Sequence, residues 1–262
     1  MSKVVYKRAE LMKIQIIGVG IIGEAQAFLA SQLGHEVLGF DSAKPTSQYA
    51  RMVKHIEKDV DITFICTPEA AVEEVVGELV RQELKGLYVI RSSVPPKTTQ
   101  RLMEKYGVHL CHNPEFLRVK TAFDDIIHPH FVLIGQCCPE HGDILRKFYL
   151  SAEHPVLITQ PIISETVKLT LNSYLATLIA FWNEINELTS SMGVDTKEVA
   201  RIARSDPRVS VYGTEFFGVA FGGTCLPKDI KQLIQACLQG GINPLLLEAV
   251  RDSNNELKIV SA

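Results

Sequence analysis

The sequence predicts an α/β protein: a Rossmann-like, doubly wound parallel sheet, followed by a long central helix and a small all-helical domain. Three observations predict this fold class. A short β-branched run at 13–17 ends in Gly18-x-Gly20-x-x-Gly23. Apolar runs then alternate with helix-like stretches up to residue 150, which is typical of a parallel sheet. From Ile163 to Met192, apolar residues recur at helical spacing without a strong helix breaker.

The first β-α-β unit runs from residue 13 to residue 41. The strand at 13–17 leads through the glycine turn into a helix at 24–33, which Gly34 closes. A second strand, 36–41, ends in Asp41. Met12 directly precedes the first strand, which leaves two interpretations of residues 1–11: a loose extension, or an upstream start.

The remaining elements follow the same alternation and then change to helices alone. Further strands are expected at 62–66, 88–91 and 130–135, with helices at 69–82, 97–106 and 140–150. The run at 163–192 predicts one helix of ~30 residues, near 45 Å long. Because that length exceeds what one small core needs, we expect the helix to pack against both domains and to offer a surface for dimerisation. Later helices are expected at 195–203, 229–239 and 244–257. We therefore predict an NAD-binding Rossmann domain at 1–160, and at 161–262 a long central helix with a helical dimerisation and substrate domain.

The composition is that of an ordinary globular protein. The 262 residues are 46% hydrophobic and 22% charged, with a net charge of −3. No long basic run occurs, so neither nucleic acid nor an anionic membrane is expected as a partner. No apolar stretch reaches the ~20 residues needed to span a bilayer, and the first residues lack a signal-peptide pattern. Six cysteines without a CxxC pair predict reduced thiols, a cytoplasmic location and no metal site.

The glycine pattern is typical of a dinucleotide-binding turn. Gly18 permits the tight turn, Gly20 lets a pyrophosphate approach the backbone, and Gly23 lets the helix pack closely on the strand. The helix N-terminus then receives the phosphate charge. Asp41 would accept hydrogen bonds from the adenosine ribose and repel a 2′-phosphate, which favours NAD over NADP. The alternative is a glycine turn without a ligand. The expected cofactor residues here are Gly18, Gly20, Ile21, Ile22, Gly23 and Asp41.

Two more motifs stand at the carboxyl ends of expected strands. Thr67 and Pro68 follow the strand at 62–66, and Ser92 and Ser93 follow the strand at 88–91. Open α/β sheets bind ligands at this edge, which predicts contacts with the cofactor. Ordinary turn chemistry explains the same residues equally well.

Polar groups of the second half form three further motifs. Residues 113–118, Asn-Pro-Glu-Phe-Leu-Arg, put Glu115 and Arg118 in a loop after a strand. Glu165, Lys168 and Asn172 fall on one helical face, at i, i+3 and i+7. Residues 206–209, Asp-Pro-Arg-Val, present a guanidinium on a loop. Taken singly, Glu115 also fits a surface salt bridge, and Lys168 and Asn172 also fit a solvated helix face.

Cys225 follows a glycine pair and comes just before an expected helix, within Phe221-Gly222-Gly223-Thr224-Cys225. A helix N-terminus and nearby lysines favour the thiolate, which is the nucleophilic form of cysteine. Taken alone, a buried core thiol is the alternative.

In this order, the seven motifs resemble the UDP-glucose/GDP-mannose 6-dehydrogenase family of nucleotide-sugar dehydrogenases, and the match runs through nearly the whole chain. The resemblance implies oxidation of a primary alcohol to a carboxylate by two NAD⁺. Cys225 would be the nucleophile that forms a thiohemiacetal and then a thioester. Lys168 and Asn172 would steady the oxyanion, Asp229 would position or deprotonate water, and Glu115 would serve in acid/base steps.

The resemblance also implies where substrate binds and how the chain assembles. Arg208 would reach the substrate within one chain or across a homodimer interface, and the loop 215–223 would line the sugar pocket. The substrate-binding residues implied are Phe116, Leu117, Arg118, Arg208, Phe221, Gly222 and Gly223. In the family a third domain holds the nucleotide, whereas this sequence ends soon after the helix at 244–257. We therefore expect weak nucleotide-sugar binding unless a separate chain supplies a nucleotide-binding domain.

The sequence departs from the family pattern at several positions, and two other functions stay open. Only 26 positions separate Asp41 from Thr67, Ser93 stands where the family commonly has Thr, and Val119 replaces an acid. One alternative is a two-electron dehydrogenase of the β-hydroxyacid or 6-phosphogluconate type, which uses a helix lysine and no thiol. The other is a truncated relative that binds NAD without turnover.

Overall fold

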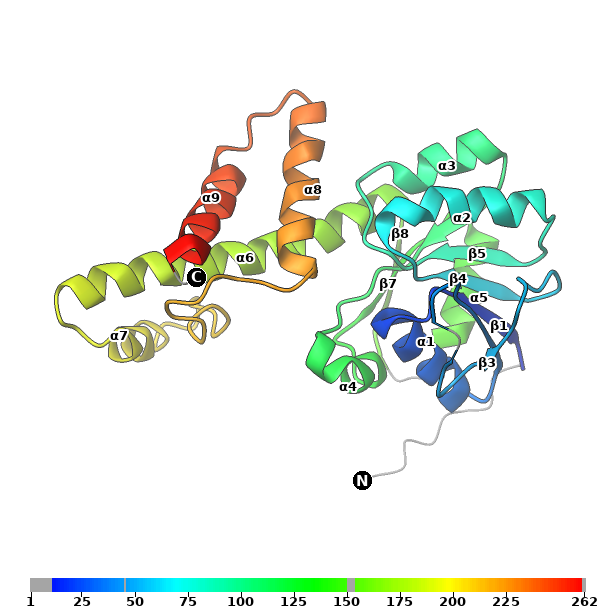
Figure 1. Cartoon of the computed structure of the whole chain (residues 1–262), viewed down its shortest axis with the longest axis horizontal. Helices are drawn as coiled ribbons and strands as arrows, with labels where there is room; N and C mark the ends of the chain where they lie inside the picture. Colours follow the sequence, from blue (N-terminus) through cyan, green and yellow to red (C-terminus); the bar gives the residue numbers. More distant parts are fainter. Residues whose placement is uncertain (1–10, 45, 150–153, 261–262) are drawn as a thin grey trace. The chain divides into compact units, whose positions relative to one another are not determined.

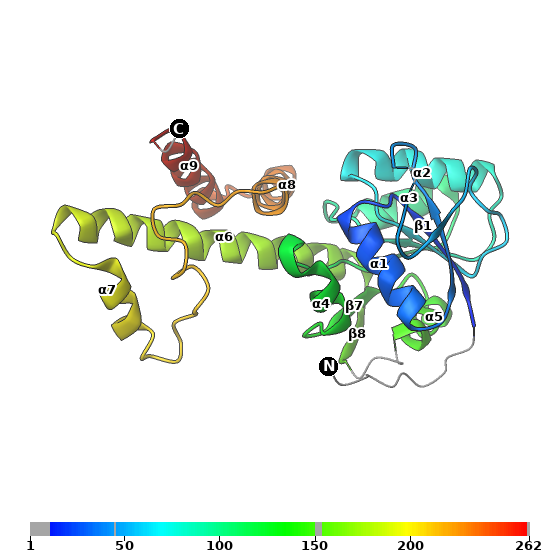
Figure 2. The same cartoon turned by 60° about the horizontal axis from the view of Figure 1, so that its bottom comes forward.

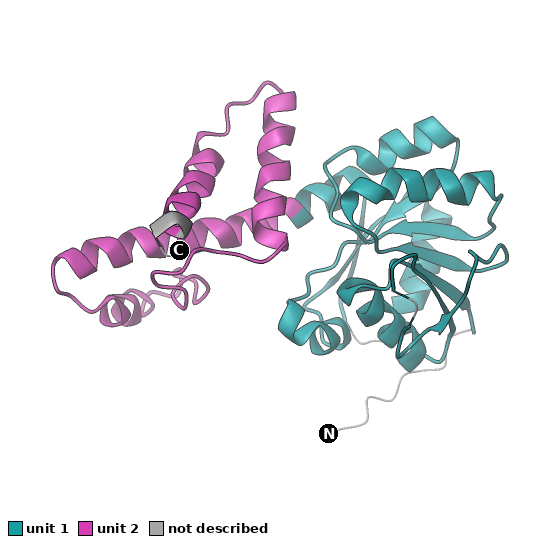
Figure 3. Ribbon diagram, in the orientation of Figure 1, with its two compact units in different colours: residues 1–168 teal, residues 169–262 magenta. Residues whose placement is uncertain are grey.

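The structure is a computed structural model that describes residues 11–44, 46–149 and 154–260. It divides into two compact units, residues 1–168 and 169–262 (Figure 3). This division falls inside the long helix, and the expected domain boundary at 160/161 stays a prediction. Of the expected extension at 1–11, only Leu11 is described. Within the described part of the chain, no helix is both long and apolar enough to cross a membrane.

Unit 1 is built on one eight-stranded sheet, in the order β3-β2-β1-β4-β5-β6-β7-β8 (Figure 1). The strands are β1 Lys13–Ile17, β2 Glu36–Phe40, β3 Arg51–Met52, β4 Ile62–Ile65, β5 Leu87–Ile90, β6 Leu110–His112, β7 Val132–Gly135 and β8 Val156–Thr159. Every neighbouring pair is parallel except β6 and β7, which meet antiparallel through the single pair His112↔Gly135. The Rossmann-like parallel sheet is thus confirmed, with one antiparallel junction that the sequence analysis did not foresee.

Helices cover both faces of this sheet, as doubly wound topology requires (Figures 1 and 2). One core joins the sheet to α1 Ile21–Gln32, α4 Ala122–Ile127 and α5 Pro139–Tyr149. The other joins it to α2 Glu69–Arg81 and α3 Thr98–Tyr106. Inner strands β1, β4 and β5 are buried along almost their whole length, because helices pack on both sides of them.

All the expected strands and helices of this half form, with ends shifted by at most three residues. Not foreseen were β3, β6, β8, α4 and a 3₁₀ turn, η1 Val119–Thr121. Strand β8 lies at the sheet edge, where Leu157 and Ile158 are exposed although both side chains are apolar. A connection through the short α4, in place of a full crossover, suffices between β6 and β7 because they run antiparallel.

The described part of unit 2 is helical, which agrees with the expected all-helical domain. Helix α6, Pro161–Ser191, starts in unit 1 and confirms the long helix expected at 163–192. It is followed by α7 Thr196–Ala203, α8 Cys225–Gln239 and α9 Leu245–Val260. Their shared core consists of Ala176, Ile179, Ala180, Phe221, Ile230, Ile234 and Val250.

Helix α8 begins at Cys225, four residues before the expected start at residue 229. Pro227 is compatible with this earlier start because the amides of a first helical turn have no intrahelical partner to lose. Cys225 is therefore the first residue inside the helix rather than a residue ahead of it.

Candidate active site

The glycine turn between β1 and α1 has the geometry that its spacing predicted. Gly18 has φ +87°, and a Cβ there would lie 2.9 Å from the backbone of Cys66 and Thr67. A Cβ on Gly23 would lie 1.9 Å from the carbonyl oxygen of Gly18, so only glycine lets α1 approach the turn this closely. A Cβ on Gly20 would meet nothing within 4 Å. The turn therefore leaves open space beside Gly20, where a pyrophosphate would approach.

The N-terminus of α1 faces this turn, and no side chain of the described residues caps it. Gly20 is its N-cap residue, and Ile21 and Ile22 open its first turn. Because the first amides of a helix have no intrahelical acceptor, they are available to an anion. Ile21 and Ile22 would contact such an anion through their backbone amides and not through their apolar side chains.

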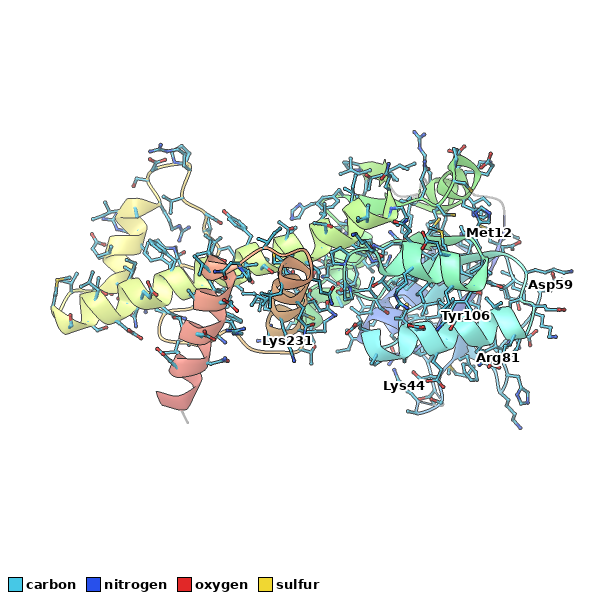
Figure 4. The ribbon with its side chains drawn as sticks, turned by 90° about the horizontal axis from the view of Figure 1, so that it is seen from above. Met12, Lys44, Asp59, Arg81, Tyr106 and Lys231 are labelled. Atoms are coloured by element: carbon cyan, nitrogen blue, oxygen red, sulfur yellow. The ribbon has the colours of Figure 1, made fainter. Side chains whose placement is uncertain are left out.

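Asp41 lies just beyond β2 and is tied to the glycine turn. Its Oδ2 accepts a hydrogen bond from the amide of Val19 at 2.7 Å, and its Oδ1 accepts from the amides of Ala43 and Lys44. Partial burial acts to raise the pKa of Asp41, but these amides and the Lys44 charge together lower it below the ordinary value. Lys44, labelled in Figure 4, donates from Nζ to the carbonyl of Val19 at 2.9 Å. The carboxylate is thus held ionised beside the turn, and its remaining lone pairs can accept ribose hydroxyls.

The ends of β4 and β5 contribute polar groups to the same sheet edge. Ser92 Oγ donates to the carbonyl of Thr67 at 2.6 Å, which joins the two segments. Thr67 Oγ1 is buried and has no hydrogen-bond partner among the described residues. Pro68 is the N-cap residue of α2, and Ser93 is buried next to Ser92. An unpartnered buried hydroxyl is costly unless a ligand satisfies it, so this edge fits a bound dinucleotide.

Glu115 and Lys168 form a buried ion pair in unit 1. Lys168 Nζ lies 3.4 Å from Glu115 Oε1, with side chains that are 3% and 7% exposed. Glu115 Oε2 accepts a hydrogen bond from the Leu117 amide at 2.7 Å, which closes the loop after β6. The same Nζ lies 5.4 Å from the ring centroid of Phe116, over its face. Neither residue is therefore on a solvated surface, and the interpretation of Glu115 as a surface salt bridge is wrong.

Glu165, which precedes Lys168 by one helical turn, contacts the start of α3 instead of Glu115. Its carboxylate accepts hydrogen bonds from the amides of Lys97 and Thr99 and from Thr99 Oγ1, at 2.6–2.7 Å. Burial raises the pKa of Glu165, while these three bonds act to lower it. The side chain thereby binds the first turn of α3 and fixes α6 beside the segment that follows β5.

In unit 2, Asn172 and Asp229 meet in a buried hydrogen bond. Asn172 Nδ2 donates to Asp229 Oδ2 at 2.6 Å, and Asp229 is fully buried. Lys228 Nζ lies 3.1 Å from the other oxygen, Oδ1. Cys225 is half-buried at the first position of α8 and stands four residues, or one helical turn, before Asp229. The thiol therefore shares a helix face with a carboxylate that an amide and an ammonium hold in place.

The expected substrate-binding residues are more dispersed. Arg118 is exposed and pairs with Asp125 at 2.6 Å, and Arg208 is exposed and pairs with Asp206 at 2.5 Å. The side chain of Phe221 is buried in the unit 2 core, and its backbone exchanges two hydrogen bonds with Asn254. Exposed Gly222 and Gly223 follow it, Gly223 with φ +71°.

The sequence analysis missed a buried polar network under the loop at 113–118. Arg91 Nη1 donates to Asn113 Oδ1 at 2.5 Å and to the hydroxyl of Tyr149 at 2.9 Å. His112 is fully buried beside it, with Nδ1 2.7 Å from Ser164 Oγ. Burial, with the charges of Arg91 and Lys168, lowers the pKa of His112 to about 3. The one sequence signal for this network is Arg91 at the end of an apolar strand, because a buried guanidinium needs hydrogen-bond partners.

The open glycine turn, the ionised acid beyond the next strand and a threonine at a third strand end that has no partner among the described residues together are typical of a dinucleotide-binding Rossmann fold. Comparison with known proteins agrees. The NAD-binding domain of the UDP-glucose/GDP-mannose dehydrogenase family matches residues 49–153, and the central domain of that family matches residues 163–256. The chain belongs to this family, and it is an NAD-dependent oxidoreductase.

Two curated relatives illustrate the match. UDP-glucose 6-dehydrogenase of Rickettsia bellii is 32% identical over 294 aligned positions, which cover 94% of this chain and 67% of that protein. GDP-mannose 6-dehydrogenase of Pseudomonas aeruginosa is 27% identical, with 94% of this chain and 69% of that protein covered. The chain thus spans about two thirds of the length of these relatives.

Two solved structures carry the fold comparison. A UDP-glucose dehydrogenase from the archaeon Pyrobaculum islandicum matches with a TM-score of 0.86 at 26% identity, over 96% of this chain and 70% of that one. A 3-hydroxyisobutyrate dehydrogenase of Mycobacterium tuberculosis matches with a TM-score of 0.77 at 15% identity, over 94% of each chain. The second match extends the likeness in fold beyond the nucleotide-sugar dehydrogenases.

Proposed function

We propose that this chain oxidises the C6 primary alcohol of a nucleotide sugar, UDP-glucose-like or GDP-mannose-like, to a carboxylate. The observation that carries the proposal is Cys225: a half-buried thiol at the first position of α8, one turn before the buried Asp229. A two-electron alcohol oxidation needs no such thiol, whereas a four-electron oxidation uses one to hold the aldehyde. The relatives support the substrate class, since they are named UDP-glucose and GDP-mannose 6-dehydrogenases.

The reaction balances as two oxidations and one hydrolysis. NAD⁺ supplies the hydride acceptor for both oxidations, held at Gly18–Gly23, Asp41, Thr67 and Ser92. The alcohol first loses a hydride and a proton to give the aldehyde. The Cys225 sulfur then adds to the aldehyde carbon, and loss of a second hydride and proton converts the thiohemiacetal to a thioester. Water cleaves the C–S bond, which releases the carboxylate and restores the thiol.

Lys168 and Asn172 are proposed to stabilise the oxygen that becomes negative in the addition and hydrolysis steps. They stand four residues apart on α6, so an ammonium and an amide project from the same side of one helix. Preorganised donors of this kind contribute strongly, and loss of one costs roughly 10²–10³-fold in rate.

Asp229 and Glu115 are proposed as the groups that handle protons. Asp229 is buried and positioned by Asn172 and Lys228, which suits a carboxylate that orients or deprotonates water. Glu115, paired with Lys168, would exchange protons during thioester hydrolysis.

Substrate contacts are proposed for Phe116, Leu117 and Arg118 in unit 1, and for Arg208 and the segment Phe221–Gly223 in unit 2. The exposed glycines are suited to present backbone groups to a sugar, with Phe221 as their buried anchor. Arg208 lies on an exposed loop, and we propose that its side chain contacts a substrate bound to a second protomer.

We propose a homodimer that forms through α6. Tyr174, Phe181 and Leu188 recur at seven-residue intervals along this helix, and each is more than half exposed. An exposed apolar stripe of this kind is typical of a helix that packs against a partner. We also propose a cytoplasmic location, which suits six free cysteines and a catalytic thiol.

The test compares Cys225→Ser with Cys237→Ser, a matched thiol on the same helix. NADH formation is followed with UDP-glucose and with GDP-mannose, and NAD⁺ affinity is measured separately by titration. We expect Cys237→Ser to retain the wild-type rate and Cys225→Ser to lose carboxylate formation by at least about 10³-fold, with NAD⁺ affinity unchanged in both. Carboxylate formation by Cys225→Ser at the wild-type rate would refute the thioester route and favour the two-electron alternative. Absence of NADH with both sugars, each supplied well above its dissociation constant, would refute the substrate class.

A further inference from the structure

We propose that unit 1 holds a structural zinc ion, bound by His109, Cys137, Cys138 and His141. One ligand atom from each residue can be chosen so that all four lie within 4.8 Å of one another. Two thiolates and two imidazoles are a preferred ligand set of structural zinc, and two thiolates also neutralise its charge. No step of the proposed oxidation uses any of these residues.

The distances come close to those of a tetrahedral site. With Zn–S near 2.3 Å and Zn–N near 2.0–2.1 Å, neighbouring ligand atoms lie about 3.3–3.8 Å apart. Cys137 Sγ is 3.1 Å from His141 Nδ1 and 4.0 Å from Cys138 Sγ. The rings of His109 and His141 have centroids 5.2 Å apart and stand almost perpendicular. Small side-chain rotations would therefore suffice to place the four ligand atoms around one ion.

The backbone holds the segment that carries three of these ligands. The amide of Gln136 donates to the Thr159 carbonyl at 2.9 Å, and the amide of Gly142 donates to the Cys138 carbonyl at 3.1 Å. A Cβ on Gly142 would lie 1.9 Å from Gln136 Oε1, so glycine lets this turn close on itself. The site is thus organised before an ion binds.

The surroundings supply an outer partner and an entry route. The buried Cys111 has its Sγ 3.7 Å from Cys137 Sγ, within reach of a weak hydrogen bond to a metal-bound thiolate. His141 also lines a cavity of about 640 Å³, together with Met12 and Asp59, which Figure 4 labels. An ion can enter from this side.

The antiparallel junction explains both the position and the purpose of the site. When the antiparallel register His112↔Gly135 is continued along both segments, residue 109 falls opposite residue 138. This is the amino end of β6, at the sheet edge opposite Gly18, Thr67 and Ser92. The junction between β6 and β7 rests on that one register pair, whereas each other strand pair has at least two. A zinc ion bound across it would fasten β7, β8 and α5 to the rest of the sheet.

The test uses the 262-residue chain, which is reduced, stripped with EDTA and titrated with ZnCl₂ against a chromophoric chelator. We expect one zinc ion per chain for the wild type and for the control Cys237→Ser, whose thiol lies on α8. His109→Ala and Cys138→Ser should each weaken zinc binding by more than the roughly 10–100-fold that loss of an outer partner costs. Because His109 is exposed, its substitution should leave the fold intact, and NAD⁺ affinity monitors this. Co²⁺ in place of zinc should give a thiolate charge-transfer band that Cys138→Ser diminishes.

Three results would overturn the proposal. The first is no stoichiometric zinc in the wild type. The second is zinc binding that His109→Ala and Cys138→Ser both retain. Zinc binding that Cys225→Ser alone removes would count equally against the proposal. The third is a disulfide between Cys111 and Cys137 that forms in the stripped protein and that added zinc does not prevent. It would be seen as a fall in the number of free thiols from six to four.

Discussion

Replacing Lys168 with methionine is expected to destabilise unit 1 severely, because it leaves the Glu115 carboxylate buried without its counter-charge. The two charges are 3.4 Å apart and almost fully buried. At an effective dielectric constant of about 20, that separation corresponds to about 5 kcal/mol of attraction. Breaking a buried pair by removing one partner typically costs about 3–5 kcal/mol. We therefore expect Lys168→Met to lower the free energy of unfolding by about 3–5 kcal/mol.

The double variant isolates the ion pair from the loss of side-chain packing. Glu115→Gln alone leaves the Lys168 ammonium buried and is also expected to destabilise. Combining it with Lys168→Met removes both charges, so the double variant should be more stable than Lys168→Met alone, with a coupling of at least about 2 kcal/mol. Urea unfolding followed by circular dichroism measures all four proteins at pH 7. Single-variant costs that simply add, or a Lys168→Met cost below about 1 kcal/mol, would show that the pair is not buried as described.

Three further perturbations test other parts of the structure. The pKa of His112 is lowered to about 3, so the contribution of the neutral imidazole to stability is complete above pH 6.5 and is lost as pH falls towards 3. Between pH 7 and pH 5, the free energy of unfolding of the wild type should fall by about 2 kcal/mol relative to that of His112→Gln. Parallel stability curves for the two proteins would contradict this. Gly23→Ala places a Cβ 1.9 Å from the Gly18 oxygen and should weaken NAD⁺ binding at least about tenfold by titration; an unchanged affinity would mean that α1 need not approach the turn. Phe181→Glu should convert the proposed dimer, twice 29.1 kDa, to monomer in light scattering, and a wild-type mass near 29.1 kDa would exclude the dimer.

The geometry of the candidate cofactor site could be predicted from the sequence because it depends on local backbone conformation. The positive φ of Gly18 and the close approach at Gly23 follow from a few adjacent residues, and the glycine spacing records them directly. Asp41 is likewise placed by the end of the next strand. The long helix was equally predictable, because some thirty residues of helical spacing leave few alternatives.

Pairings between distant residues could not be predicted in the same way. Lys168 lies 53 positions from Glu115, and Asn172 lies 57 positions from Asp229, so their contacts depend on how whole elements pack. The antiparallel junction between β6 and β7 is invisible in an alternation of strands and helices, which by itself predicts parallel pairing. The sequence has no CxxC spacing, and the four proposed zinc ligands come within 4.8 Å of one another only in the folded unit.

The structure also gives meaning to residues that the motifs left ambiguous. Glu165 shares a helix face with Lys168, yet its carboxylate is fully engaged with the first turn of α3. Phe221 belongs to a glycine-rich motif, yet its side chain is core. Both act on the site through the positions of neighbouring segments, which only the packed structure reveals.

The most direct test of the central claim is to observe substrate carbon covalently bound to Cys225. The chain is mixed with NAD⁺ and UDP-glucose or GDP-mannose, quenched in acid during turnover, and analysed by intact mass and peptide mapping. The account predicts an acyl adduct on the peptide that contains Cys225, absent from Cys225→Ser and present in Cys237→Ser, with two NADH formed for each carboxylate released. Steady carboxylate formation without any adduct on Cys225, or with one NADH per product, would contradict it.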